Sequence, residues 1–235
     1  MRSLILHLPD ERFKSDLLIP PSFDQIKEVA ALIMKNSNEE GFQKFFSKNP
    51  HFLFRAIPSS GDEILGFLTK PPISNFFNAD YAIFTVGQGG CGITLIELES
   101  PSDRLFTKKL TPSAKLQTAI GQVDDWNQWL INNKESFINV CLELLERNEK
   151  LPKVSANMSF KTHTNQKMKA LWNAFGGAEG CFITNTVVIG RWSQLNERER
   201  KRLLFYNSQK RSGYLQIRTY DQLIRKGFEG QHMFW

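Results

Sequence analysis

The chain has 235 residues, of which 41% are hydrophobic and 12% aromatic, a composition that supports one large folded unit and excludes an intrinsically disordered chain. No apolar run approaches the roughly 20 residues of a membrane-spanning helix, and the first residues lack a secretory signal, so we expect a cytoplasmic protein without a membrane partner. The net charge of +6 comes from residues 191–235, where ten Lys or Arg face four Asp or Glu, and this basic end suggests a polyanionic partner.

The first 35 residues predict a small helical segment, whose helix, predicted over residues 24–36, ends at its boundary. A second helix follows, because Phe42, Phe45 and Phe46 recur at helical spacing until Pro50 closes the segment. Residues 57–63 and 69–75 are rich in Pro, Gly and Ser and predict loops. The three cysteines are far apart and odd in number, which predicts packing rather than a zinc site.

Two strands are predicted at residues 79–86 and 92–99, joined by the glycine-rich turn "GQGGCG". Antiparallel pairing across this turn brings Asp80, near the start of the first strand, towards Glu97 and Glu99 at the end of the second. Because side chains two apart in a strand share one face, these two glutamates project together, on the face of Ile93 and Leu95.

A long helix is predicted from about Ser113, with apolar residues recurring at three or four positions as far as Leu130. Gln122 lies on the flank of that face, one turn before Trp126. Further helices are expected at 134–148 and 166–177. The last third predicts a strand at 181–190, a helix at 194–210 capped by Ser193, and a strand leading into a short helix at 214–224. Such a strand–helix–strand unit joins parallel strands, so the fold class is α/β, with a mixed central β-sheet flanked by α-helices.

Paired carboxylates at the end of an apolar strand need a compensating positive charge, because like charges raise each other's pKa. A hard divalent cation supplies that charge and prefers oxygen ligands. Asp80, Glu97 and Glu99 therefore predict a Mg²⁺ or Mn²⁺ site at one end of the sheet.

Asp80…Glu97-x-Glu99, followed by Gln122-x-x-x-Trp126, resembles the core of the PD-(D/E)XK nuclease superfamily, which has a restriction endonuclease-like fold. The stretch "IELESPSDRLFTKKLTPSAKLQTAIGQVDDW" is similar to the Shedu anti-phage defence family, as are the helical stretch "EEGFQKFFSKNPHFL" and the closing "VVIGR…IRTYDQLI". This resemblance implies a Shedu-type domain over residues 36–235 after the segment 1–35. It also implies a bacterial homo-oligomer, a dimer or tetramer, that hydrolyses phosphodiesters of double-stranded DNA.

Carried over by position, the resemblance makes Asp80 and Glu97 metal ligands and places Glu99 where the superfamily usually has lysine. Gln122 orients a ligand, a water or a phosphate, and Glu40 matches an acid that some members add to the metal shell. Glu99 then acts as a general base or ligates a second metal. Three basic residues in the loop after the strand are candidates for DNA phosphate contacts: Arg104, Lys108 and Lys109.

Alternatives remain at this point. Lys108, Lys109 or Lys115 can replace the missing lysine in space, or the chain can be an inactive, DNA-binding relative of the same fold. A glycosidase with two carboxylates is a third possibility, which the basic composition disfavours.

Overall fold

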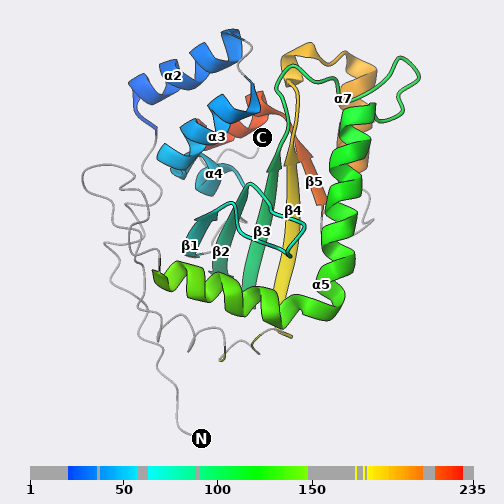
Figure 1. The fold of residues 1–235 in the computed structure, drawn as a ribbon. Coiled ribbons are helices and arrows are strands. Elements are labelled where there is room, and N and C mark those ends of the chain that lie inside the picture. The colour runs from blue at the N-terminus through cyan, green and yellow to red at the C-terminus, as the bar shows by residue number, and fades with distance from the viewer. Residues whose placement is uncertain are drawn as a thin grey trace, which may run out of the picture.

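The computed structural model describes residues 21–35, 38–57, 63–87, 90–147, 173, 177, 179–208 and 215–229. Its centre is a sheet of five strands in the order β1-β2-β3-β4-β5 (Figure 1). The strands are β1 (Glu63–Thr69), β2 (Tyr81–Gly87), β3 (Gly90–Leu98), β4 (Cys181–Val188) and β5 (Leu215–Arg218). β1, β2 and β3 pair antiparallel, whereas β3, β4 and β5 pair parallel. The predicted α/β class with a mixed sheet is confirmed.

One face of the sheet is covered by α5 (Ala114–Arg147), with α7 (Glu197–Ser208) beside it. The apolar face of α5 includes Leu116, Val123 and Trp126, which are fully buried against the sheet. Ile93 and Leu95 of β3 point to this face. The side of β3 that carries Glu97 is therefore the side covered by α5.

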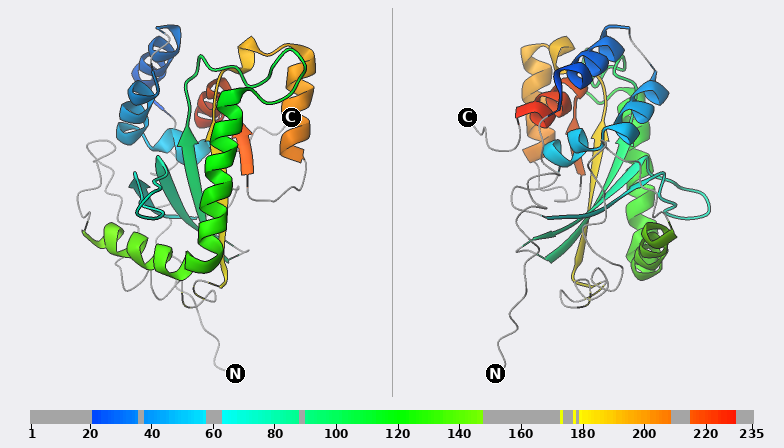
Figure 2. Two further views of the ribbon diagram at one scale, coloured as in Figure 1. Left: turned by 45° about the vertical axis from the view of Figure 1, so that its right-hand side comes forward. Right: turned by 90° about the vertical axis from the view of Figure 1, so that its left-hand side faces the viewer.

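The opposite face is covered by α2 (Phe23–Met34), α3 (Glu39–Lys48), α4 (His51–Ala56) and α8 (Tyr220–Glu229). Figure 2 shows these helices on the other side of the sheet from α5. Phe42, Phe45 and Phe46 of α3 are buried here, as their spacing predicts. Two contacts fix α3 on β2, because the Tyr81 hydroxyl donates to the Gln43 carbonyl (2.6 Å) and lies 3.2 Å from Ser47 Oγ.

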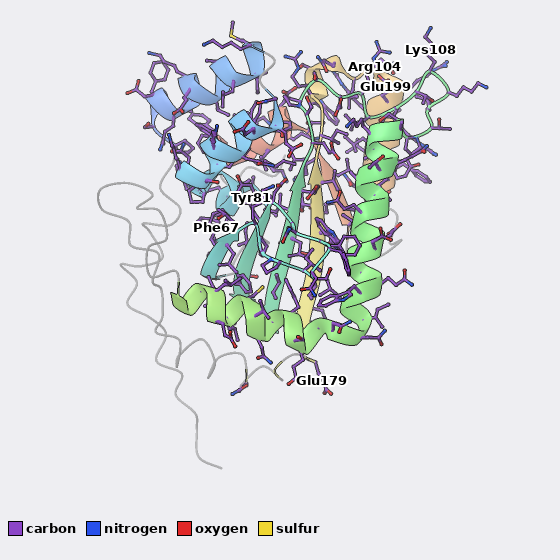
Figure 3. The ribbon with its side chains drawn as sticks, in the orientation of Figure 1. Phe67, Tyr81, Arg104, Lys108, Glu179 and Glu199 are labelled. Atoms are coloured by element: carbon purple, nitrogen blue, oxygen red, sulfur yellow. The ribbon has the colours of Figure 1, made fainter. Side chains whose placement is uncertain are left out.

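Several elements differ from the sequence prediction. Strand β1 is absent from that prediction; it packs beside β2, where Phe67 and Tyr81 stack at 5.3 Å (Figure 3). The predicted helices over 113–148 form the single helix α5, which changes direction partway along (Figure 1). Helix α7 is capped by Asn196 and not by Ser193, because Asn196 and Glu199 exchange side chain–backbone hydrogen bonds. The turn at 88–89 and most of the helix expected at 166–177 lie outside the described residues.

The three cysteines are free and buried, as predicted. Burial raises the pKa of the Cys141 and Cys181 thiols to about 12 and that of Cys91 to about 11, which keeps all three protonated and unreactive at neutral pH. The helices also agree with the hydropathy of the sequence. Within the described ranges, none is both long and apolar enough to cross a membrane.

The carboxyl ends of β3 and β4 lie side by side at one end of the sheet. Leu98 pairs with Val188, and the next backbone amide, of Glu99, donates to the Val188 carbonyl (2.8 Å). The segments that leave the carboxyl ends of parallel strands emerge at the same edge of a sheet. The loop after β3 and the turn after β4 therefore meet directly.

Gly190 makes this meeting possible. It has a positive φ of 61°, and its amide donates to the Ser100 carbonyl (3.1 Å). A Cβ at this position would lie 2.5 Å from both the Asp103 carbonyl oxygen and Leu105 Cδ1. Only glycine fits this backbone conformation and contact without a shift of the loop.

The outer edge of β5 is closed by a side chain of α7. Asn207 Nδ2 donates to the Ile217 carbonyl (2.8 Å), and Asn207 Oδ1 accepts from the Ile217 amide (2.8 Å). The amide side chain thus makes the pair of hydrogen bonds that a neighbouring strand would make at this residue. The backbone of the short edge strand is satisfied at this residue within the chain.

We predict that Gly190→Ala destabilises the protein more than Gly177→Ala does. Gly177 has the same φ of 61°, but a Cβ at that position would have no atom of the described residues within 4 Å, so its substitution isolates the backbone cost, about 1 kcal/mol. Gly190→Ala adds the collision with the loop, roughly a further 1–3 kcal/mol. Urea unfolding of the two variants measures the difference, and equal losses would contradict the close contact.

Candidate functional site

Four carboxylates gather at the carboxyl end of β3: Glu39, Asp80, Glu97 and Glu99, here called the carboxylate cluster. The charges of these acids act on one another. They come from three places in the chain, namely the first turn of α3, the start of β2 and the end of β3. As the antiparallel pairing predicts, Asp80 lies against the end of β3, because its amide donates to the Ile96 carbonyl (3.0 Å) and its Oδ2 accepts from the Leu98 amide (2.7 Å).

Asp80 is buried, with 3% of its surface exposed, and its carboxylate accepts three hydrogen bonds. Gln43 Nε2 (2.8 Å) and Lys70 Nζ donate to Oδ1, and the Leu98 amide donates to Oδ2 (2.7 Å). The donor from Leu98 ties Asp80 to the backbone of the neighbouring strand. Asp80 is thus held in place by α3, by the residue after β1 and by β3 at once.

Glu97 projects from β3 towards α5, where Gln122 Nε2 donates to its Oε1 (3.0 Å). Its other oxygen, Oε2, is buried and accepts no hydrogen bond from the described residues. Burial first, then the charges of Asp80, Glu99 and Glu39, raise the pKa of Glu97 to about 9. The Glu97 carboxyl therefore holds a proton at neutral pH unless a further positive charge approaches.

Glu99 lies one step beyond β3 and is only half-buried. Its backbone carbonyl accepts a hydrogen bond from the buried Tyr220 hydroxyl (2.7 Å). Burial raises the pKa of Glu99, as do the charges of Glu39 and Asp103, while Lys115 of α5 opposes that rise. Of the three lysines considered as replacements for the missing one, Lys115 is the one whose charge acts on this glutamate.

The structure places Glu39, rather than Glu40, with the cluster. Glu40 faces solvent and pairs with Lys44 one turn along α3 (2.6 Å), with 64% of its side chain exposed. Glu39 is half-buried, its pKa is raised by burial and by Asp80, and Gln43 Nε2 lies 2.5 Å from its Oε1. The helical phase explains the correction, since Glu39 precedes the buried Phe42 by three residues and shares its face.

Lys70 is a cation of this site that the sequence pattern does not indicate. Its ammonium forms an ion pair with Asp80, and its charge lowers the pKa of both Glu97 and Glu39. It follows β1 directly, its φ of 50° lies in the left-handed region, and its amide donates to the Asp80 carbonyl (2.8 Å). A non-glycine residue in this conformation is uncommon and is held by its surroundings.

The cluster fits a hard cation by the chemistry of its donors, and the unpartnered Oε2 of Glu97 is the atom that most needs one. As they stand, however, the described residues include no three His, Cys, Asp or Glu side chains arranged to hold a metal ion. Lys70 supplies the countercharge of Asp80 instead. Part of the positive charge that the clustered carboxylates require is thus supplied by Lys70.

Arg104, Lys108 and Lys109 lie in the loop between β3 and α5, and all three are exposed. The loop is closed on itself, because the Thr107 amide donates to the Thr111 carbonyl (2.8 Å) and Phe106 and Pro112 form a β-bridge. Figure 3 shows Arg104 and Lys108 at the end of the sheet where β3 ends. Their contact with DNA stays a prediction.

A comparison with protein families shows which family the chain belongs to. The family model described as Shedu protein SduA, C-terminal, matches residues 36–224. The chain belongs to the Shedu family. A comparison with curated proteins finds no match.

Membership of the Shedu family indicates a role in anti-phage defence. The matched range contains all four carboxylates of the cluster, Gln122, Lys70 and the loop with Arg104. The division of the chain at residue 35 stays a prediction. Helix α2, which lies before the matched range, packs Val29 into the same apolar cluster as α3.

We predict that Lys70→Gln destabilises the metal-free Shedu domain by about 1 kcal/mol, because it removes the ion pair of a buried carboxylate. Lys44→Gln is the matched control, since it breaks an ion pair on the solvent side of α3 and should leave stability unchanged. Guanidinium unfolding in the presence of a chelator measures both. A Lys70→Gln variant as stable as the wild type would remove Lys70 from the charge balance of the cluster.

Glu97 gives the metal-free protein a pH-dependent stability. Its folded-state pKa of about 9 lies above the ordinary 4.5, so the folded state binds the proton more tightly than the unfolded chain. The stability from this group is complete below the ordinary pKa and is lost as the pH rises towards 9. We therefore predict that the melting temperature of Glu97→Gln falls less than that of the wild type from about pH 6 to about pH 9. Glu40→Gln should keep the wild-type trend, and parallel curves for Glu97→Gln and the wild type would refute the raised pKa.

Proposed function

We propose that the protein is a Mg²⁺- or Mn²⁺-dependent endonuclease of the PD-(D/E)XK superfamily that cuts double-stranded DNA in bacterial anti-phage defence. The observation that carries the proposal is the half-buried Glu97, which has a raised pKa and a buried oxygen that accepts no hydrogen bond from the described residues, beside two further acids. Strongly perturbed carboxyls gathered at one end of a sheet are typical of catalytic sites. The Shedu assignment supports the setting in defence.

Asp80 and Glu97 would hold the metal, with Glu99 as a further source of oxygen ligands. When bound, the metal would supply Lewis-acid stabilisation of a phosphodiester and a more acidic water. Lys70 now neutralises Asp80, so binding of the cation would replace one countercharge of Asp80 by another. Glu39 takes the place expected for Glu40 as the acid contributed by α3.

The remaining residues of the site would position these ligands and move protons. Gln122 holds Glu97 through its Oε1 and leaves Oε2 free to bind. Burial raises the pKa of Glu99, which makes its carboxylate a stronger base towards a proton of water. Lys115, whose charge opposes the raised pKa of Glu99, would supply the positive charge that a lysine at position 99 gives other members.

The DNA would approach from the end of the sheet where the loop after β3 lies. Arg104, Lys108 and Lys109 are exposed there and would contact phosphates. Such contacts carry binding that weakens as salt rises, through release of counterions. As expected from the resemblance, we propose that the protein acts in the bacterial cytoplasm as a homo-oligomer, a dimer or tetramer.

A second candidate function is a DNA-binding module of the same fold without nuclease activity. Two observations favour it, namely glutamate at position 99 and the occupation of Asp80 by Lys70. This module would bind DNA with the same salt dependence but would cleave nothing with any metal. The two functions therefore differ in cleavage and not in binding.

We predict that the purified protein nicks or cuts supercoiled and linear DNA with Mg²⁺ or Mn²⁺, and that Glu97→Gln lowers the cleavage rate at least about 100-fold, because it removes a ligand charge. Gel analysis measures the products, and circular dichroism confirms the fold. Glu40→Gln is the matched control and should cleave like the wild type.

Three results bear on the assignment. Cleavage by Glu97→Gln at the wild-type rate would place the chemistry elsewhere. Binding of DNA without cleavage, by a wild type tested across metals, would favour the second candidate. Loss of activity in Glu40→Gln equal to that in Glu97→Gln would restore Glu40 to the site.

A further inference from the structure

A pocket of about 620 Å³ lies beside the carboxylate cluster, between the loop after β3 and the start of α7. The short helix η1 (Trp192–Gln194) forms part of its wall. Arg104, Lys108 and Arg191 supply its positive charges, and Asp103 and Glu199 its negative ones. Figure 3 shows Arg104, Lys108 and Glu199 at the same end of the molecule.

The two acidic side chains of the pocket interact with neighbouring parts of the protein. The Glu199 carboxylate accepts from the Asn196 amide (2.9 Å) and so serves the cap of α7. Asp103 acts towards the cluster, where its charge raises the pKa of both Glu39 and Glu99. With three basic and two acidic side chains in its lining, the pocket keeps a small excess of positive charge.

The pocket and the cluster share a wall. Asp103 lines the pocket and is close enough to the cluster to shift the pKa of two of its acids. Arg191 follows β4 at the edge where β3 ends, because Leu98 and Val188 pair in register. Gly190, immediately before Arg191, holds the loop of Asp103 against this edge.

Arg191 is positioned within this wall. With the Gln194 amide oriented so that both of its ends are satisfied, its oxygen accepts from Arg191 Nε (3.1 Å) and from a second guanidinium nitrogen. An arginine carries five N–H donors in a rigid plane, so three remain for a ligand. Oriented guanidinium groups bind phosphate oxygens through paired, charge-assisted hydrogen bonds.

We propose that this pocket receives a phosphodiester of the DNA, next to the one held at the carboxylate cluster, with Arg191 and Arg104 as its contacts. This inference rests on the proposed function, because it assumes that DNA lies across the cluster. A polymer fits better than a free anion, because further exposed basic side chains lie on the same two elements as the lining, with Lys109 in the loop and Arg198 on α7. Lys201 of α7 is also exposed, but it pairs with Glu197 (2.7 Å).

The test is DNA binding in a chelator, where no cleavage takes place. Fluorescence anisotropy with a short labelled duplex is measured over a series of salt concentrations for the full chain and for Arg191→Gln and Arg104→Gln. Loss of one phosphate contact reduces the slope of log Kd against log salt by about 0.9 and raises Kd roughly tenfold at low salt. The same loss is expected on duplexes of different sequence.

Lys134→Gln is the matched control for charge. Lys134 lies on α5, and its charge acts on Cys181, the first residue of β4, at the far end of the sheet from the pocket. This variant should bind like the wild type. Arg191→Lys keeps the charge but not the paired donors and should restore the salt slope while recovering only part of the affinity.

The outcomes distinguish a failure of the pocket proposal from a failure of the proposed nuclease function. If the wild type binds DNA and Arg191→Gln and Arg104→Gln both keep its salt slope, the pocket is not a phosphate site and Arg104 is not a DNA contact, while the nuclease activity, which the cleavage assay tests, stands. If the wild type does not bind DNA, both proposals fall. If Lys134→Gln loses as much as Arg191→Gln, the effect is one of net charge and the pocket is excluded. Competition by inorganic phosphate at concentrations that leave the ionic strength unchanged would show that the pocket takes a free anion instead of a strand.

Discussion

The structure depends on keeping four carboxylates together at one end of a buried sheet. Like charges that are shielded from water raise each other's pKa and oppose folding, and the fold answers in three ways. Asp80 is surrounded by donors, Glu97 is held by Gln122 on one oxygen, and Lys70 and Lys115 bring opposite charge from two different elements. The second oxygen of Glu97 accepts no hydrogen bond from the described residues. In the proposed function, this atom would bind the metal.

Each layer of the fold contributes one part of this balance. The helices on one face bring Glu39 and Gln43 through α3, which Tyr81 ties to β2. The helix on the other face brings Gln122, and β1 at the edge of the sheet delivers Lys70. Lys70, directly after the first strand, thus supplies positive charge to this group of acids. In the proposed nuclease, the metal would therefore replace Lys70 as the countercharge of Asp80.

The sequence predicts those parts of the site that arise from local pattern. Strand alternation puts Glu97 and Glu99 on one face, and the glycine turn pairs their strand with that of Asp80. Lys70 could not be predicted from a local pattern, because its ion pair with Asp80 depends on the position of β1. The short apolar run of β1 lies between two segments that predict loops. Glu39 was within reach, since the spacing of Phe42 and Phe46 already defines the buried face of α3. The phase of the helix predicts Glu39 as the acid near the site, whereas the position carried over from the family resemblance gives Glu40.

The amide of Asn207 also limits how copies of this chain can assemble. By making both backbone hydrogen bonds of Ile217, it ends the sheet at β5, and a second chain could not continue the sheet at that residue without displacing the side chain. At this residue the β5 margin is therefore protected against edge-to-edge pairing with a second copy of the chain.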